Sequence, residues 1–411
     1  MLSVLLAGLP VQAAGNYTID CNGKKIATPE THIVEKTITT LDGGGALTNP
    51  QDIFIDAQDN IYVADTGNNR IVVLDSQGRY LRSYTAGNSL RSPSGVYVAE
   101  FGSLFVADTG NERIVNINPD DTVAEVFTKP DSDMLTESSD FAVTKVCLSA
   151  QGFLYTLKGQ QFMMIDADNQ FKGFVGANYL PFSLKRVFVR LFATEEQKQK
   201  LEVEEAPPYT NFMIGHDGML YAVAATSLEK IKKLNVSGKN VFPADYTTEQ
   251  LYDSDGLPVD TNFVDITVDD HDVISVLEQT SGRIYQYDQE GNLLSVFGGL
   301  GDKRGYFRIP VSIAADSQSR LYVLDSSTGY IHVFAQTTFM EQVADAVQYY
   351  TDGQYQQAHD PWSAVAEIDV NYPLANRGIG QTLYKMGKTD EALEYLRVSN
   401  DRQQNGVVFN E

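Results

Sequence analysis

The chain has 411 residues, a length that suits one large domain with a smaller module. Its 31 basic and 54 acidic residues leave a net charge of −23, which would repel phosphate backbones and anionic membrane surfaces, so we expect no nucleic-acid partner. A hydrophobic content of 43% and an aromatic content of 10% supply enough apolar material for a folded core.

The first residues have the pattern of an export signal. Residues 2–13 form a short apolar run that ends in small residues, and the chain becomes polar at Asn16. We therefore expect residues 1–14 to be a signal peptide and the protein to be extracytoplasmic, whether secreted, periplasmic or at the cell surface. An N-terminal strand is the alternative interpretation. No later stretch reaches the roughly 18 to 20 apolar residues of a membrane span, and an anchor beyond Glu411 is left open.

A repeat begins in the next part of the chain. The segment Ile-Tyr-Val-Ala-Asp-Thr-Gly-Asn-Asn-Arg-Ile at 61–71 returns 43 residues later at 104–114. Weaker copies start at Leu154, Leu220, Ile274 and Leu321. A period of about 40 to 50 residues made of strand-like pieces is typical of a propeller blade. Six copies predict an all-β, six-bladed β-propeller over residues 49–335.

The sixth copy lacks a fourth strand, because the pattern after Phe334 changes to helical spacing. Residues 32–41 alternate in side-chain character ahead of the first blade. We expect them to supply the missing strand, since closing the ring removes an exposed sheet edge. Residues 15–48 would then be a lead-in that carries this ring-closing strand.

The blades resemble repeats of the NHL family. A Pro-x-x-Ile/Val segment opens blades at Pro50, Pro93 and Pro310, and the first two blades continue into Ala-Asp-Thr-Gly-Asn-x-Arg-Ile. The resemblance is close in blades one and two, fair in five and six, and poor in three and four. It implies a propeller of a kind that commonly serves recognition.

Residues 176–208 lie outside the repeat pattern. Their middle part mixes basic and large apolar side chains, at Arg186, Phe188, Arg190 and Phe192. This insertion is either an interaction element or a helix that covers one end of the propeller channel. On the first interpretation, these four residues are candidates for contact with a partner.

Residues 338–411 have helical spacing. Gly353 and Gly387 are 34 residues apart, which is the period of the tetratricopeptide repeat that this segment resembles. We expect a small all-α tail of helical hairpins, which adds Tyr355, Trp362 and Tyr384 as candidate partner contacts.

Metal-binding candidates are few. Asp65, Asp108 and Asp325 recur at one position in three blades, and His216 and His271 lie in turns between strands. A ring of acids could bind calcium or serve a lactonase-like reaction, and some propellers, such as an amidating lyase, hold a metal on channel histidines. The simpler interpretation is that each aspartate stabilises its own Asp-Thr-Gly-Asn turn.

The sequence favours a non-catalytic extracytoplasmic binding or scaffolding protein that recognises a protein, a small ligand or a carbohydrate. A propeller hydrolase or lyase with a divalent metal in the channel is the alternative, and a carbohydrate-binding component of a surface uptake system is a third. Nucleotide-binding and nucleophile-elbow motifs are missing, so we expect no cofactor apart from that alternative metal. Cys21 and Cys147 allow at most one disulfide.

Overall fold

We describe the protein from a computed structural model. It describes residues 15–399 apart from 21–22, 100–101, 136–139, 159–160, 177–207, 225–228, 247, 250 and 253–255. The chain divides into two compact units. The propeller unit comprises Ile33–Leu293 and Gly298–Ala335, and the helical unit comprises Met1–His32, Leu294–Phe297 and Gln336–Glu411.

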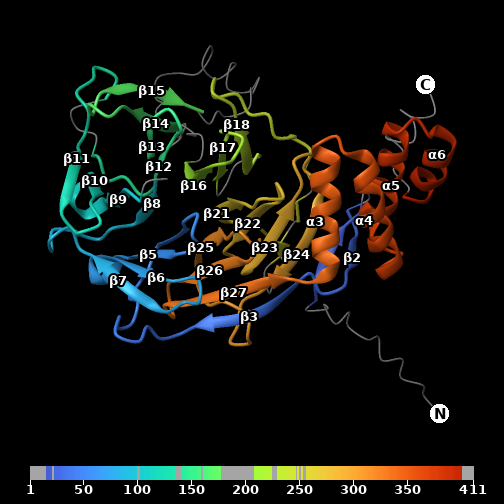
Figure 1. The fold of residues 1–411 in the computed structure, drawn as a ribbon, viewed down its shortest axis with the longest axis horizontal. Coiled ribbons are helices and arrows are strands. Elements are labelled where there is room, and N and C mark those ends of the chain that lie inside the picture. The colour runs from blue at the N-terminus through green and yellow to red at the C-terminus, as the bar shows by residue number, and fades with distance from the viewer. Residues whose placement is uncertain are drawn as a thin grey trace. The chain divides into compact units, whose positions relative to one another are not determined.

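Six antiparallel sheets form the propeller unit (Figure 1), which confirms the predicted six-bladed fold. Blade one contains β4 (Asp52–Ile55), β5 (Ile61–Asp65), β6 (Arg70–Leu74) and β7 (Tyr80–Tyr84). Blade two contains β8 (Gly95–Val98), β9 (Leu104–Asp108), β10 (Arg113–Ile117) and β11 (Val123–Phe127). Blade three contains β12 (Val146–Leu148), β13 (Leu154–Lys158), β14 (Gln161–Ile165) and β15 (Phe171–Val175).

The remaining blades vary more. The described strands of blade four are β16 (Tyr209–Ile214), β17 (Leu220–Ala224) and β18 (Ile231–Leu234), and a short hairpin follows, β19 (Leu251–Tyr252) with β20 (Pro258–Val259). Blade five contains β21 (Phe263–Val268), β22 (Ile274–Glu278) and β23 (Arg283–Tyr287), followed by β24 (Leu293–Gly298). Blade six contains β25 (Pro310–Ala315), β26 (Leu321–Asp325) and β27 (Tyr330–Gln336).

The first strands of the blades form a closed circle. Each of β4, β8, β12, β16, β21 and β25 contacts the next in this order, and β25 contacts β4. The fourth strand of blade six is β3 (His32–Ile38), which comes from the segment ahead of blade one. The two ends of the repeat array therefore share one sheet.

Apolar side chains between neighbouring sheets form the core. Successive side chains of a strand point to opposite faces of its sheet. A β-branched or aromatic residue on each face can therefore pack against the blade on that side. Between blades six and one, for example, Ile61 and Val63 belong to the same buried cluster as Tyr322 and Leu324. Similar clusters join blades one and two, two and three, and three and four.

The Asp-Thr-Gly-Asn segments are tight turns between the second and third strands. In blade one, Thr66–Asn68 forms one turn of 3₁₀ helix, and Asn69 follows in the left-handed region with φ of 54°. A Cβ on Gly67 would lie 2.6 Å from the carbonyl oxygen of Thr48, so the position requires glycine.

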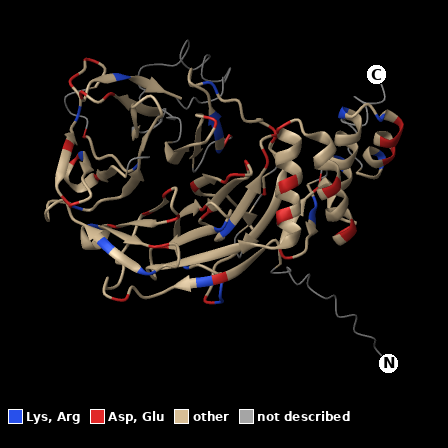
Figure 2. Ribbon diagram, in the orientation of Figure 1, with Lys and Arg blue, Asp and Glu red and all other residues tan. Residues whose placement is uncertain are grey.

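The helical unit contains two small strands, β1 (Tyr17–Ile19) and β2 (Lys25–Ala27), and four described helices. The helices are α3 (Thr338–Thr351), α4 (Tyr355–Ile368), α5 (Pro373–Lys385) and α6 (Thr389–Val398). None of the described helices is long and apolar enough to cross a membrane. Acidic residues are spread over both units (Figure 2).

Two helices end in the same way, 34 residues apart. After α3, Gly353 (φ 74°) donates its N–H to the carbonyl of Tyr350, and Gln354 donates to that of Tyr349. After α5, the N–H groups of Gly387 (φ 77°) and Lys388 donate to the corresponding carbonyls, those of Tyr384 and Leu383. This is the glycine-terminated Schellman arrangement, and it explains why glycine recurs there.

One predicted partner contact in this unit is wrong. Trp362 is 5% exposed, and a Cβ on Gly378 of α5 would lie 2.3 Å from its ring. The indole therefore fills the space that the glycine leaves between α4 and α5, and it belongs to the core. Tyr355 and Tyr384 are half-buried, and the Tyr355 ring packs edge-on against Tyr350 at 5.4 Å. Their role in partner binding stays a prediction.

Candidate functional site

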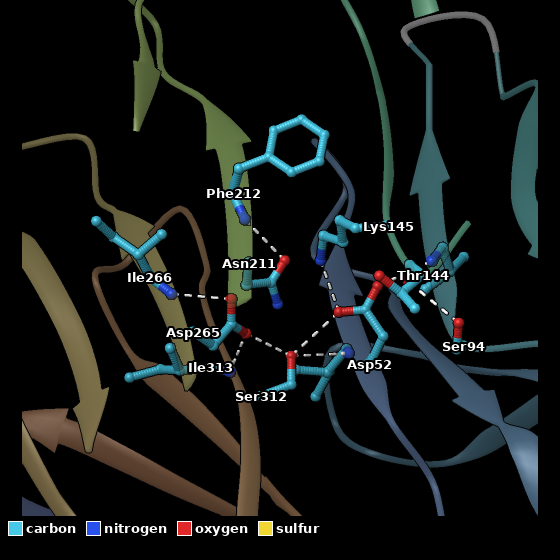
Figure 3. A network of polar contacts seen from close by, with 12 residues as sticks. Asp52, Ser94, Thr144, Lys145, Asn211, Phe212, Asp265, Ile266, Ser312 and Ile313 are labelled. Carbon is cyan, nitrogen blue, oxygen red and sulfur yellow. Dashed lines mark hydrogen bonds and ion pairs between the residues drawn. The ribbon is translucent and has the colours of Figure 1, made fainter. Parts of the chain in front are cut away.

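One position in every blade places a residue at the centre of the propeller. It lies nine residues before the first residue of each blade's second strand. This places it within the blade's first strand (β4, β8, β16, β21 or β25) or, in blade three, directly before β12. The six residues, which we call the channel ring, are Asp52, Gly95, Lys145, Asn211, Asp265 and Ser312. The side chains of the five residues other than Gly95 converge from different blades (Figure 3). The five that carry a polar side chain are buried, with exposures from 0% to 9%.

The channel ring connects neighbouring blades by accepting backbone N–H groups. Asp52 Oδ2 of blade one accepts the N–H of Val96 in blade two at 2.8 Å. Asp265 Oδ2 of blade five accepts the N–H of Ile313 in blade six, also at 2.8 Å. Ser312 Oγ of blade six accepts the N–H of Ile53 in blade one at 3.2 Å. These three contacts satisfy buried donors that no strand pairing reaches.

The side chains of the ring also contact one another. Lys145 Nζ lies 2.6 Å from Asp52 Oδ1, and it reaches this carboxylate past Gly95. A Cβ on Gly95 would lie 2.5 Å from the carbonyl oxygen of Thr144 and 2.9 Å from Lys145 Cα. Glycine at this ring position therefore leaves the room in which the lysine of the next blade fits.

Ser312 joins the two carboxylates. Its Oγ lies 2.6 Å from Asp265 Oδ2 and 3.1 Å from Asp52 Oδ1. A hydroxyl carries one proton, so it can donate to only one of these oxygens at a time. When Asp265 is protonated, it can donate to Ser312 while Ser312 donates to Asp52, and all three groups are then satisfied.

Burial raises the pKa of Asp265 from its ordinary 3.8 to about 6; Lys145 opposes this rise and the Asp52 carboxylate adds to it. Burial by itself would lower the pKa of Lys145, but the attraction of Asp52 and Asp265 outweighs it, and the pKa of the lysine is raised overall. The lysine is therefore charged at neutral pH, whereas Asp265 changes its charge near pH 6.

A cavity of about 420 Å³ lies against the ring, inside the propeller unit. Lys145 and Asp265 line it, together with apolar side chains that include Phe54, Tyr97, Phe212, Met213 and Ile214. At its rim, His216 Nε2 lies 3.0 Å from Asp270 Oδ1, and both side chains are more than half exposed. Cys147 also lines the cavity, and burial raises the pKa of its thiol to about 12, so it stays protonated.

The predicted acids lie elsewhere, inside the turns. Asp65 accepts the N–H of Thr48 at 2.7 Å, the amide of Asn68 at 2.8 Å and Nε of Arg70 at 2.7 Å. Asp108 repeats this set in blade two, with the N–H of Arg91 and the side chains of Asn111 and Arg113. These carboxylates hold the turn to the segment that precedes each blade.

Acidic residues at the same position in blades five and six make similar contacts. Asp325 accepts four backbone N–H groups, from Arg308, Ile309, Ser327 and Thr328. Glu278 likewise accepts the N–H groups of Asn262, Thr280 and Ser281. The interpretation of these acids as turn-stabilising groups therefore agrees with their contacts.

The two predicted histidines are apart from these acids. His216 is at the cavity rim, and Nδ1 of His271 lies 3.0 Å from Ser319 Oγ on a neighbouring turn. Among the described residues, no three His, Cys, Asp or Glu side chains gather closely enough to hold a metal ion. The candidates Arg186, Phe188, Arg190 and Phe192 lie outside the residues that the structure describes.

The residues of the channel ring were not predicted from the sequence. The signal was present, because the six residues keep one constant spacing from the repeated second strand. Their types differ from blade to blade, however, so a search for a recurring motif passes over them. An alignment of the six copies on their second strands places all six residues in one column, that of Asp52.

The sequence profile of the NHL repeat matches residues 47–74, which cover β4, β5 and β6 of blade one. No curated protein sequence matches the chain significantly.

Solved structures with similar folds are distant. A catalytically inactive variant of virginiamycin B lyase from Staphylococcus aureus, solved with quinupristin, is 13% identical, with a TM-score of 0.45 over 78% of this chain and 87% of that one. A protein of unknown function from Bacteroides thetaiotaomicron is 12% identical, with a TM-score of 0.49 over 77% and 80%. The WD40 propeller domain of Doa1 is 11% identical, with a TM-score of 0.44 over 74% and 97%. At these values the likeness carries no argument about activity.

Proposed function

We propose that this protein is a non-catalytic, extracytoplasmic binding protein that takes a small ligand, or an apolar side chain of a partner, into its channel cavity. The observation that carries the proposal is the combination of an apolar-walled cavity of about 420 Å³ with a polar floor whose groups are fixed by hydrogen bonds. Cavities of roughly 300 to 1,000 Å³ with few, well-placed polar groups are typical of ligand-binding sites.

The contacts of the floor favour binding over catalysis. Both oxygens of Asp265 already accept hydrogen bonds, Oδ1 from the N–H of Ile266 and Oδ2 from Ser312 and Ile313. The Ser312 side chain is fully buried between two carboxylates, so it is out of reach of a substrate as a nucleophile. A general base or nucleophile needs an oxygen that is free to meet the substrate.

Lys145 is the group that we expect to contact the ligand. Its ammonium carries three N–H donors, it lines the cavity, and its ion pair with Asp52 uses one of them. A carbonyl or amide oxygen is the matching acceptor. The ligand would therefore combine an apolar body with a carbonyl or amide group.

The helical unit would supply a second contact surface for a protein partner. The identical glycine-terminated ends of α3 and α5, 34 residues apart, support its interpretation as tetratricopeptide-like hairpins. Hairpins of that kind commonly bind other proteins, which would make the chain a two-site scaffold.

The test is to block the cavity at its rim. Ala57 is exposed and lines the cavity, so Ala57→Trp should fill the entrance without disturbing the core. Ala124→Trp makes the same change on the exposed strand β11 and is the matched control. N-acetyl-leucinamide and N-acetyl-phenylalaninamide, observed by saturation-transfer NMR, should bind the wild type and the control but not Ala57→Trp.

Equal binding to all three proteins would refute the channel as the site. Metal analysis of the purified protein, with thermal unfolding before and after chelation, tests the alternative enzyme. Stoichiometric metal together with a large fall in Tm on chelation would replace the binding proposal with a metal-dependent hydrolase or lyase.

A further inference from the structure

A second cavity, of about 560 Å³, lies on blade six. One wall is the linker that precedes β25, with Lys303, Arg304, Tyr306 and Arg308, and the other is the turn between β26 and β27. Thr37 of the ring-closing strand β3 also lines it. All of these residues belong to the propeller unit.

A single carboxylate fixes both walls. Asp325 Oδ2 accepts the N–H groups of Arg308 and Ile309 from the linker, at 2.6 and 3.2 Å. Its Oδ1 accepts those of Ser327 and Thr328 from the turn, both at 3.0 Å. The cavity is therefore preformed, and the negative charge of Asp325 is already used by four N–H donors.

The remaining charge of the cavity is positive. Arg304 is held in place because its Nη2 donates to the carbonyls of Val34 and Glu35 at 2.7 and 2.8 Å. Lys303 is exposed, with Nζ 5.8 Å from the centre of the Tyr306 ring. Arg308 pairs with Asp302 at 2.9 Å, but both side chains are at least 60% exposed, so this pair is weak and open to exchange. Such a basic cavity is unusual in a chain of net charge −23.

The uncharged groups of the cavity match a sugar. Tyr306 and Tyr330 line the cavity with aromatic rings, on which a pyranose could stack, and Thr37, Ser327 and Thr328 line it with hydroxyl-bearing side chains. His332 also lines the cavity and is 7% exposed.

We propose that this cavity binds an acidic oligosaccharide, one whose sugar rings carry carboxylates. Lys303 and Arg304 receive a carboxylate, and the two tyrosines receive the sugar faces. The site is separate from the channel cavity, so the protein has two independent ligand sites on its propeller.

The experiment is calorimetric titration of the full chain with trigalacturonate, and with maltotriose as the neutral counterpart. Trigalacturonate should bind and maltotriose should bind at least about tenfold more weakly, since a charged hydrogen bond contributes more than 1.4 kcal/mol. Lys303→Glu should weaken trigalacturonate binding by about tenfold or more, whereas Lys239→Glu, the same change on an exposed lysine of blade four, should leave it unchanged.

Further outcomes decide the proposal. Tyr330→Ser should also weaken binding, because it removes one of the two rings that receive a sugar face. Tyr330 is 37% exposed, so its removal spares the core. Ala57→Trp, which blocks the channel, should have no effect, and a loss with that variant would place the sugar in the channel instead. Equal binding of maltotriose, or competition by acetate at matched concentration, would overturn the proposal.

Discussion

Two sets of buried acidic residues recur around this propeller, and they differ in what recurs. In the turns of blades one and two the same residue types return, and Asp65 and Asp108 make the same three contacts within their own repeat and the segment before it. In the channel ring the position returns but the residue type changes, and Asp52 and Asp265 contact residues of other blades. A residue type that returns in several blades indicates contacts within each blade. A residue type that differs between blades at one fixed position indicates a network of contacts shared by several blades.

The largest effect is expected from removing the cation of the ring. Lys145→Met leaves Asp52 and Asp265 without a buried counter-charge and should lower the free energy of unfolding by about 3 to 5 kcal/mol. Adding Asp52→Asn to it should recover a large part of this loss. Urea unfolding measures both, with Lys239→Met on the surface as the control. A single-variant loss below about 1 kcal/mol would contradict the network.

A smaller, pH-dependent effect is expected at Asp265. Its pKa is about 6 in the folded protein against an ordinary 3.8, so the folded state holds the proton more tightly than the unfolded state does. Its contribution to stability is therefore fully present below pH 3.8 and is lost as the pH rises to about 6. The loss amounts to as much as about 3 kcal/mol.

Asp265→Asn removes this titration. Relative to the wild type, the variant should gain stability between about pH 4 and pH 6 by up to about 3 kcal/mol and then keep a constant difference. Urea unfolding at intervals of half a pH unit measures it. A difference between the two proteins that does not change with pH would show that Asp265 is ionised throughout.

The smallest effect sharpens the contrast between the two sets. Asp65→Ala and Asp108→Ala should each cost about 2 kcal/mol, because each leaves several donors of one turn unpaired. The double variant should cost the sum to within about 0.5 kcal/mol, since the two turns share no partner. Asp52→Asn with Asp265→Asn should depart from additivity, because both side chains contact Ser312. Additivity in both pairs would remove the distinction.

The fold could be predicted from the sequence because similar local sequence patterns of strands and turns return in each blade. The 43-residue return of Ala-Asp-Thr-Gly-Asn predicts a strand, a turn and a strand, and blades one and two show this order in β5, β6, β9 and β10. The channel ring could not be predicted from a repeated residue type, because its residue types differ between blades. The roles of Gly95 and Lys145 follow only from their contact in the folded chain. Trp362 was misjudged for a related reason: its burial depends on Gly378 in the next helix.

The pairing of β3 with β27 has a consequence for how the protein folds. The partner strands begin at His32 and Tyr330, so about three hundred residues of chain must be ordered between them before this sheet can form. Contacts so distant in sequence raise the contact order and slow folding. During synthesis, β3 would stay unpaired, and the apolar face of blade one that packs against blade six would stay uncovered, until the last blade emerges, which exposes both to aggregation. A circular permutant that joins β27 directly to β3 and opens the chain between two other blades would turn that closure into a local hairpin and should fold faster.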